Sequence, residues 1–310
     1  MTSHDAVAFV RRVLGEKRVG HTGTLDPAAA GVLPICVGQA TRLVEDLQAG
    51  TKRYIAEATF GRETDSGDLL GETVRECDAS GLDLETLRGA LNAFRGEIEQ
   101  TPPLHSAVKV GGQKLYELAR RGETVEIPTR RVTISGLHVS RWMPGQTPRA
   151  MIEIECSGGT YIRSLVRDIG RAVGLAATMS FLLRTRSGMF SVENAVSPQE
   201  FAAKPELIPL REALEWVSLW QVQDDDLALA LWQGKRVQLP AAPFISRKQF
   251  AHTLPVEEAR EFLFTPARQP DGPVLVENEA GMLLALASRG EDGAWKADKV
   301  FDLRTPSANG

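Results

Sequence analysis

Three strand-like stretches occur in this chain without a regular helix between each pair of them. Met151–Cys156 alternates apolar and acidic residues, which is typical of a strand with one buried face. Lys52–Phe60 and Val132–Ile134 have the same strand character. A doubly wound parallel sheet needs a helix after each strand, and the sequence lacks that rhythm. The pattern therefore predicts an α+β domain with a mixed or antiparallel sheet.

A chain of 310 residues is long enough for two domains. The stretch from about residue 205 to 226 turns acidic and loses the earlier periodicity, so we expect a first domain at 1–215 and a second at 216–310. In the second, Leu227–Gln233 predicts a short helix, and Val274–Val276 with Met282–Leu286 predict a hairpin. The second domain should therefore be small and β-rich.

Composition excludes several classes of protein. The content of 43% hydrophobic and 25% charged residues is that of a soluble globular protein, and a net charge of −4 argues against a generally basic nucleic-acid binder. No apolar run approaches the roughly 20 residues that cross a bilayer. The N-terminus has no signal-peptide core, and the three cysteines form no C-x-x-C motif. We expect a cytoplasmic protein with reduced thiols.

Charge is distributed unevenly along the chain. Residues 54–100 hold 4 Lys and Arg against 11 Asp and Glu, whereas residues 105–186 hold 13 against 6. Clustered cations of this kind can bind a polyanion through phosphate contacts and counterion release. They can equally form a solvated face with scattered salt bridges. Both interpretations fit the second stretch.

The loop Gly20–Pro27 holds a single carboxylate, Asp26, among small and turn-forming residues. Asp26 followed by Pro27 is also how a short helix begins, with Asp as the N-cap and Pro at the first helical position. Alternatively, the glycines at 20 and 23 make a tight loop whose backbone lies close to a flat ligand. The second interpretation makes Asp26 a candidate catalytic nucleophile.

Two further residues carry possible binding chemistry. Tyr54 faces with the small residues Ala56 and Ala58 at period two, which leaves a platform that suits a stacked base, although a core tyrosine fits as well. Arg163 lies in the first turn of a predicted helix, where its charge opposes the helix dipole. An acidic partner would explain it. Arg167 and Arg171 follow Arg163 at intervals of four residues and so lie on the same face of the predicted helix. These two arginines fit a solvated face.

Four motifs occur in a fixed order: His21–Pro27, Lys52–Tyr54, Pro103–Lys109 and Gly159–Arg163. Together they closely resemble the bacterial tRNA pseudouridine synthase B family, in register from residue 2 to about 190. That family converts the uridine at position 55 in the T loop of transfer RNA to pseudouridine without a metal or cofactor. The resemblance implies a pseudouridine synthase catalytic domain, followed by a PUA-like RNA-binding domain that Gly234–Val237 and the hairpin suggest.

The resemblance also implies roles for single residues. Asp26 is the nucleophile, Tyr54 stacks on the target base, and Arg163 pairs with Asp26 and keeps it ionised. His21 helps to fill the space that the flipped base leaves, Leu183 is an apolar wall of the uracil pocket, and Tyr161 is a further substrate contact. Candidates for contacts with the RNA backbone are Lys109, Arg167, Arg184 and Arg186.

Several expectations stay open beside this reading. The family usually has a first strand and a Lys-Pro motif before Thr2, so either the start codon is assigned too late, which we favour, or this edge strand is absent. We expect a monomer that binds the T stem-loop of tRNA with no obligate protein partner. Alternative functions are a tRNA-folding chaperone or RNA-binding protein independent of catalysis, and a synthase acting on another RNA. Attack by Asp26 at the ribose C1′ or at the uracil C6 fits equally well.

Overall fold

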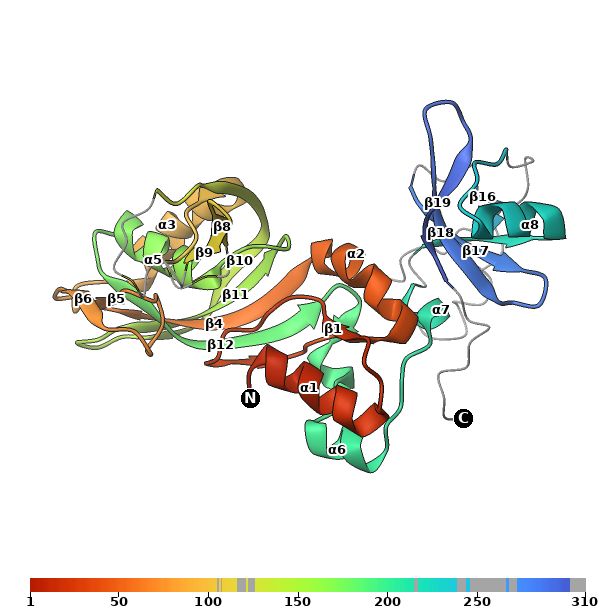
Figure 1. Ribbon diagram of the computed structural model, residues 1–310. Helices are drawn as coiled ribbons and strands as arrows, with labels where there is room; N and C mark the ends of the chain where they lie inside the picture. Colours follow the sequence, from red (N-terminus) through yellow and green to blue (C-terminus); the bar gives the residue numbers. More distant parts are fainter. Residues whose placement is uncertain are drawn as a thin grey trace, which may run out of the picture. The chain divides into compact units, whose positions relative to one another are not determined.

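The computed structural model describes residues 1–104, 106, 108–115, 121, 126–214, 217–238, 244–245, 266–267 and 272–301. The chain forms two compact units, shown with their elements in Figure 1. The first unit comprises Met1–Phe9, His21–Ile35 and Val44–Pro198; the second comprises Val10–Gly20, Cys36–Leu43 and Gln199–Gly310. The domain boundary predicted between residues 215 and 216 falls on two residues outside the described ones, and it stays a prediction.

A seven-stranded sheet forms the centre of the first unit. All of its pairings are antiparallel except that between β2 and β12, which is parallel. The predicted mixed sheet is therefore confirmed. In spatial order the strands are β13 (Phe190–Ser191), β12 (Ala177–Ser187), β4 (Lys52–Phe60), β11 (Arg149–Cys156), β10 (Arg130–Met143) and β7 (Gly96–Gln100), with β2 (Ala29–Gly31) beside β12.

Helices α3 (Leu84–Leu91) and α5 (Ile162–Ala172) pack in one core with this sheet (Figure 1). Helix α3 begins where the Asp83 carboxylate accepts a hydrogen bond from the Thr86 amide. The apolar residues Ile162, Leu165, Val166 and Ile169 of α5 are buried. The inner face of β4 is buried as well, and Ala56 and Phe60 on it are fully buried. This packing fixes the first turn of α5 against the centre of the sheet.

Shorter elements complete the first half of the chain. Pro34 and Gly38 (φ +59°) interrupt regular structure here, so the strand after Pro34 is short and the helical segment after it starts as a 3-10 turn. The elements are α1 (Ser3–Leu14), β1 (Val19–His21) paired with β3 (Ile35–Val37), the 3-10 helix Gly38–Leu43, α2 (Val44–Ala49), and the hairpin of β5 (Arg62–Thr64) with β6 (Thr73–Glu76).

Other short elements connect these. They are the 3-10 helix Asn92–Phe94, the pair β8 (Lys109–Val110) and β9 (Gln113–Lys114), the 3-10 helix Val192–Asn194, α6 (Pro198–Ala203) and α7 (Leu210–Ala213).

No helix follows Asp26, so the interpretation of Asp26 and Pro27 as a helix start is wrong. The amide of Ala29 donates to the carbonyl of Asp26 at 2.8 Å, which closes a turn, and the chain then enters β2. Pairing with β12 decides this conformation. A Cβ at Gly31, where φ is +113°, would lie 2.1 Å from the carbonyl oxygen of Arg184, so only glycine allows β2 to approach β12 this closely.

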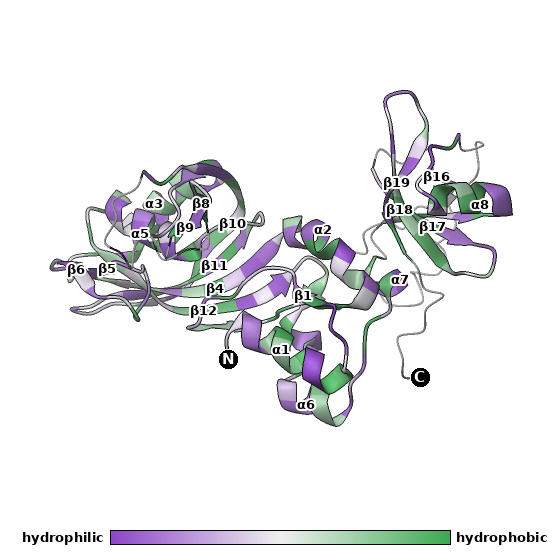
Figure 2. Ribbon diagram, in the orientation of Figure 1, coloured by the Kyte–Doolittle hydropathy of each residue, from purple (hydrophilic) through white to green (hydrophobic). Residues whose placement is uncertain are grey.

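The second unit contains the small β-rich region that the sequence predicts. The predicted hairpin is formed by β17 and β18, whose apolar residues show green in Figure 2. The predicted helix is α8 (Asp225–Trp232), capped by Asp224. The sheet order is β16 (Pro266–Ala267), β15 (Phe244–Ile245), β14 (Ser218–Val222), β17 (Val274–Asn278), β18 (Leu283–Arg289) and β19 (Trp295–Val300). Of the helices described, none has the length and hydropathy needed to span a membrane.

Candidate active site

The carboxylate of Asp26 is held by the guanidinium of Arg163 through two hydrogen bonds. Arg163 Nε donates to Asp26 Oδ2 at 2.8 Å, and Nη2 donates to Oδ1 at 2.9 Å. The Arg163 side chain is 5% exposed and that of Asp26 is 27% exposed. This geometry gives the first-turn arginine the acidic partner that the sequence predicts. It leaves one orientation for a carboxylate that still faces solvent on one side.

A second carboxylate, Asp68, lies on the other side of the same guanidinium. Its Oδ2 is 3.9 Å from Arg163 Nη1, and that nitrogen donates to the backbone carbonyl of Ser66 at 2.8 Å. The Asp68 side chain is 7% exposed, and its Oδ1 accepts hydrogen bonds from the Ser66 hydroxyl and the Leu70 amide. Arg163 is thus placed between two carboxylates from distant parts of the chain.

Sequence reasoning missed Asp68. Asp68 falls within the acidic stretch 61–80. Polar residues and glycines are mixed there without a regular period, which is typical of a surface loop. In the structure, Glu63, Thr64, Ser66 and Asp68 of this stretch are all buried. No local pattern separates a buried carboxylate from exposed neighbours of the same type. Only the contact with Arg163 identifies it.

Tyr54 lies in β4 between Ile154 of β11 and Arg184 of β12. Tyr54 packs against the apolar core and is partly buried. Its role as a stacking platform stays a prediction. Burial raises the pKa of the Tyr54 hydroxyl to about 12, although the charge of Arg184 opposes this shift. The phenol therefore stays protonated at neutral pH.

Arg184 has a different place from the one expected of an RNA-backbone contact. It is 2% exposed, which leaves it no surface from which to reach a phosphate. Its Nε donates to the carbonyl of Val32 at 2.8 Å, and its Nη2 donates to the carbonyl of Gly23 at 3.2 Å. Both hydrogen bonds bind backbone carbonyls on either side of Asp26. The expectation that Arg184 contacts an RNA phosphate is therefore wrong.

Leu183 also differs from its expected place. It pairs with Ile55, whereas Tyr54 pairs with Arg184 and Ala56 pairs with Leu182. Successive side chains of a strand point to opposite faces, so Leu183 projects from the face opposite to Tyr54. Leu182, which is 4% exposed, shares the Tyr54 face. We therefore propose Leu182 in place of Leu183 as the apolar wall.

His21 and Tyr161 flank this arrangement. His21 Nδ1 accepts a hydrogen bond from the Gly23 amide at 3.3 Å, and burial, together with the charge of Arg184, lowers the pKa of His21. Tyr161 precedes α5; its backbone exchanges two hydrogen bonds with the side chain of Gln100, and the Arg130 guanidinium lies 5.4 Å from the centre of its ring. Both residues stay candidate substrate contacts.

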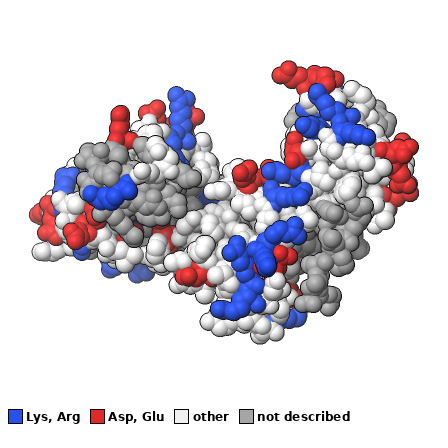
Figure 3. All heavy atoms as spheres, viewed as in Figure 1, with Lys and Arg blue, Asp and Glu red and all other residues white. Residues whose placement is uncertain are grey.

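The basic stretch 105–186 is partly neutralised by the acidic stretch that precedes it. Arg131 pairs with Glu97, Arg149 with Glu57 and Arg171 with Glu63. Figure 3 shows acidic side chains beside several of the Lys and Arg groups on the face in view. These three pairs reduce the charge excess that stands out in the sequence, which favours the salt-bridged face for these three arginines.

The remaining candidates for phosphate contacts stay predictions. Arg167 donates to Asp168 and to the carbonyl of Thr101, and Arg186 donates to the carbonyl of Gly188. Both are partly exposed. Lys109 lies in β8, and its side chain is outside the described part of the structure.

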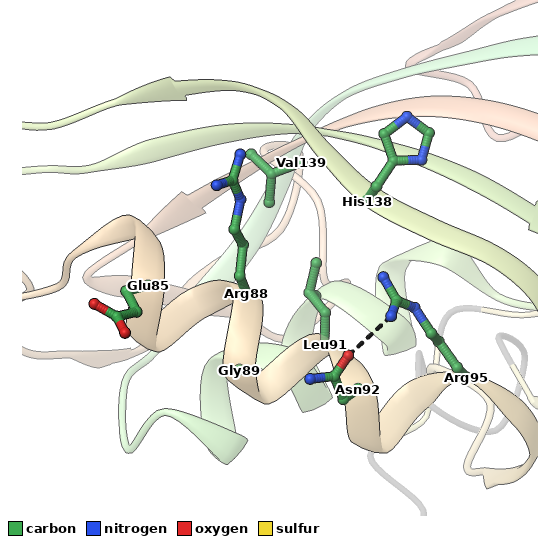
Figure 4. A pocket seen from close by; sticks show the side chains of 8 residues that line it. All are labelled: Glu85, Arg88, Gly89, Leu91, Asn92, Arg95, His138 and Val139. Carbon is green, nitrogen blue, oxygen red and sulfur yellow. Dashed lines mark hydrogen bonds between the residues drawn. The ribbon is translucent and has the colours of Figure 1, made fainter.

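A pocket of about 580 Å³ lies between α3 and β10 (Figure 4). Arg95 is fixed in it by donating to the Asn92 side chain and to the carbonyl of Leu137. None of the residues lining it is a predicted site residue. Within the described ranges, no three His, Cys, Asp or Glu side chains come together as metal ligands would.

The family model for the N-terminal domain of TruB family pseudouridylate synthases matches residues 11–162, and the model for the C-terminal domain of tRNA pseudouridylate synthase B matches residues 163–214. The tRNA pseudouridine synthase B of Symbiobacterium thermophilum is 54% identical over 69% of this chain and 72% of its own length. That of Bacillus pumilus is 40% identical over 86% of each.

Two solved structures resemble the whole fold. One is titled as an H/ACA RNP bound to a substrate RNA containing 2′-deoxyuridine; its matching chain is 23% identical, with a TM-score of 0.63 over 99% of this chain and 83% of that one. The other is a Cbf5-Nop10-Gar1 complex, 24% identical, with a TM-score of 0.61 over 97% and 81%. At this identity the likeness concerns the fold. The family models and the sequence relatives show that the chain belongs to the TruB family of pseudouridylate synthases.

Proposed function

We propose that this protein isomerises a uridine of transfer RNA to pseudouridine, at position 55 of the T loop, with Asp26 as the nucleophile. The observation that carries the proposal is the two-point ion pair between Asp26 and Arg163. The relatives named above are tRNA pseudouridine synthases B, which supports the reaction and the class of RNA.

The reaction breaks the N-glycosidic bond, turns the uracil and rejoins it through carbon. One fragment must be held covalently, or an oxocarbenium-like ribose must be stabilised, and an ionised carboxylate can do either. Arg163 binds one lone pair on each Asp26 oxygen, and the exposed side of the carboxylate keeps the others for the substrate. Asp26 can therefore attack either ribose C1′ or uracil C6 from this position.

The target uridine lies inside a folded RNA loop and has to be extruded, at a cost of a few kcal/mol. Tyr54 is only partly buried, and it is close enough to Asp26 for the carboxylate charge to act on the Tyr54 hydroxyl. A base stacked on that ring regains roughly 1–3 kcal/mol. His21, next to the turn at Gly23, is placed to fill the space that the extruded base leaves in the loop.

The proposal is tested with the Asp26→Asn variant and a T stem-loop RNA. We expect RNA affinity to stay close to that of the wild type, because Asn keeps the size of the side chain. Pseudouridine formation in single turnover should fall below detection. Isomerisation by the Asp26→Asn variant at the wild-type rate would show that Asp26 is not the nucleophile.

The same variant separates the alternative functions. A tRNA-folding chaperone would accelerate refolding of tRNA with Asp26→Asn as well as the wild type does, whereas an obligate enzyme would give no such benefit.

Mapping pseudouridines in a deletion strain identifies the RNA and the position, and loss of the modification from ribosomal RNA alone would contradict the tRNA assignment. A single monomer mass by light scattering is expected, since we propose that the protein acts without a protein partner.

A further inference from the structure

We infer that Arg184 is a positioning residue, which clamps the loop carrying Asp26 to the strand carrying Tyr54. The effect of Arg184 on catalysis rests on the proposed function, whereas its effect on the position of the loop does not. Arg184 lies in β12, between β2 and β4 in the sheet, so it reaches the chain on both sides.

Two side-chain hydrogen bonds and one strand pairing define the clamp. Nε donates to the Val32 carbonyl at 2.8 Å and Nη2 donates to the Gly23 carbonyl at 3.2 Å, so the guanidinium joins the two ends of the segment 23–32 that contains Asp26. Tyr54 is the partner of Arg184 in the register of β4, and the charge of Arg184 acts on the Tyr54 hydroxyl. A planar, rigid guanidinium fixes the relative position of these groups.

The backbone of Arg184 reinforces one end of the loop. Its carbonyl accepts a hydrogen bond from the Val32 amide at 2.9 Å, and it pairs with Gly31 in the parallel register of β2 and β12. The other end, at Gly23, is bound to β12 through the Arg184 side chain. Loss of the guanidinium should therefore free the Gly23 end while the Val32 end stays paired.

The charge of Arg184 argues that it does more than fill space. Among the residues that the structure describes, no carboxylate lies within ion-pair distance of it, and it is 2% exposed. Burial of a cation without an anionic partner costs stability, so a well-packed apolar residue would serve the fold better. Rigid placement of Asp26 relative to Tyr54 gives a reason to retain it, because a misplacement of about 1 Å can cost about 100-fold in rate.

The test compares Arg184→Lys with the control Arg75→Lys. Arg75 also donates to a backbone carbonyl, that of Gly174, but from an exposed position. Lysine keeps the charge of Arg184 and loses the fork that spans two carbonyls. Arg184→Gln is the second variant, which carries the test if Arg184→Lys does not fold, because its amide can still donate to one carbonyl.

The first readout does not depend on activity: amide hydrogen exchange of peptides covering 22–32. We expect exchange in this segment to accelerate at least about tenfold in Arg184→Lys while peptides of α5 stay protected. Unchanged exchange, or a uniform increase over the whole first unit, would overturn the clamp. If the wild type makes no pseudouridine, the proposed function fails while this readout still decides about Arg184.

The second readout separates positioning from binding. In single turnover on the T stem-loop RNA, we expect the maximal rate to fall about 100-fold with the RNA dissociation constant unchanged. Arg75→Lys should change neither. A weakened dissociation constant with an unchanged maximal rate would instead identify Arg184 as a phosphate contact and refute the inference.

Discussion

Arg163 and Asp26 are 137 positions apart in the sequence, and their side chains form a two-point ion pair with distances of 2.8 and 2.9 Å. The pair forms because β2, just after Asp26, is bound to β12, while α5 packs against β12 and β4. The same sheet thus places the loop and the first turn of the helix against each other.

The two-point geometry predicts the effect of Arg163→Lys. A lysine offers a point charge and cannot bind both carboxylate oxygens in one plane, so Asp26 loses its orientation. We expect single-turnover isomerisation to fall about 100-fold. RNA affinity should be unchanged because Arg163 is buried. Arg171→Lys, two turns further along α5 at a partly exposed pair with Glu63, is the control and should keep the wild-type rate.

Asp68→Asn tests the second carboxylate. Asparagine keeps the size of the side chain but removes the negative charge 3.9 Å from Arg163 Nη1. We expect a loss of about 1–3 kcal/mol in the free energy of unfolding in urea. The isomerisation rate should also fall, because Arg163 is less firmly placed. Asp65→Asn in the same loop is the matched control; an equal loss of rate there would contradict a specific role for Asp68.

Gly31→Ala tests the approach of β2 to β12. The new Cβ would meet the Arg184 carbonyl oxygen at 2.1 Å, at a φ of +113° that alanine adopts poorly. We expect a loss of stability above about 3 kcal/mol. Gly89→Ala in α3, where a Cβ meets open space, should instead gain roughly 0.5–1 kcal/mol. Similar urea midpoints for the two variants would disprove the steric argument.

Lys52 predicts a pH dependence of stability. Burial, with a smaller effect from Arg184, lowers the pKa of Lys52 from 10.5 to about 8. Between pH 8 and pH 10.5 the unfolded chain then binds more protons than the folded chain at this group, so the contribution of Lys52 to stability rises with pH. Lys52→Met removes the group, and the stability of the variant relative to the wild type should decline from pH 8 to pH 10. The exposed Lys204→Met is the control; a difference independent of pH would contradict the assignment.

Salt dependence tests the remaining phosphate candidates. Substitution of one phosphate-binding cation by Gln should reduce the slope of log affinity against log salt by about one unit. We expect this for Lys109, Arg167 and Arg186, measured by titration of the T stem-loop RNA at several salt concentrations. Arg184→Gln should leave the slope unchanged because that side chain is buried. Loss of a full unit of slope in Arg184→Gln would identify Arg184 as a phosphate ligand.

Periodicity predicted most of the regular structure in the catalytic half. The strand at 52–60 and the helix from 162 were readable because their buried faces follow periods of 2 and 3.6 residues. The helix expected after Asp26 was not formed, since the capping pattern of Asp26 and Pro27 is local and the pairing of β2 with β12 is not. Local preferences of about 1 kcal/mol do not outweigh a sheet pairing.

The sequence by itself determined which side chains carry chemistry: Asp26 among small residues, Tyr54 beside alanines, and Arg163 where a helix disfavours it. Only the tertiary structure decided the partners. In the folded protein Asp68 is buried beside Arg163, and Leu183 projects from the sheet face opposite to Tyr54. Arg184 lies inside the protein. The physical reason is that composition and period fix what a residue can do and which face it takes, whereas long-range strand pairing fixes what it meets.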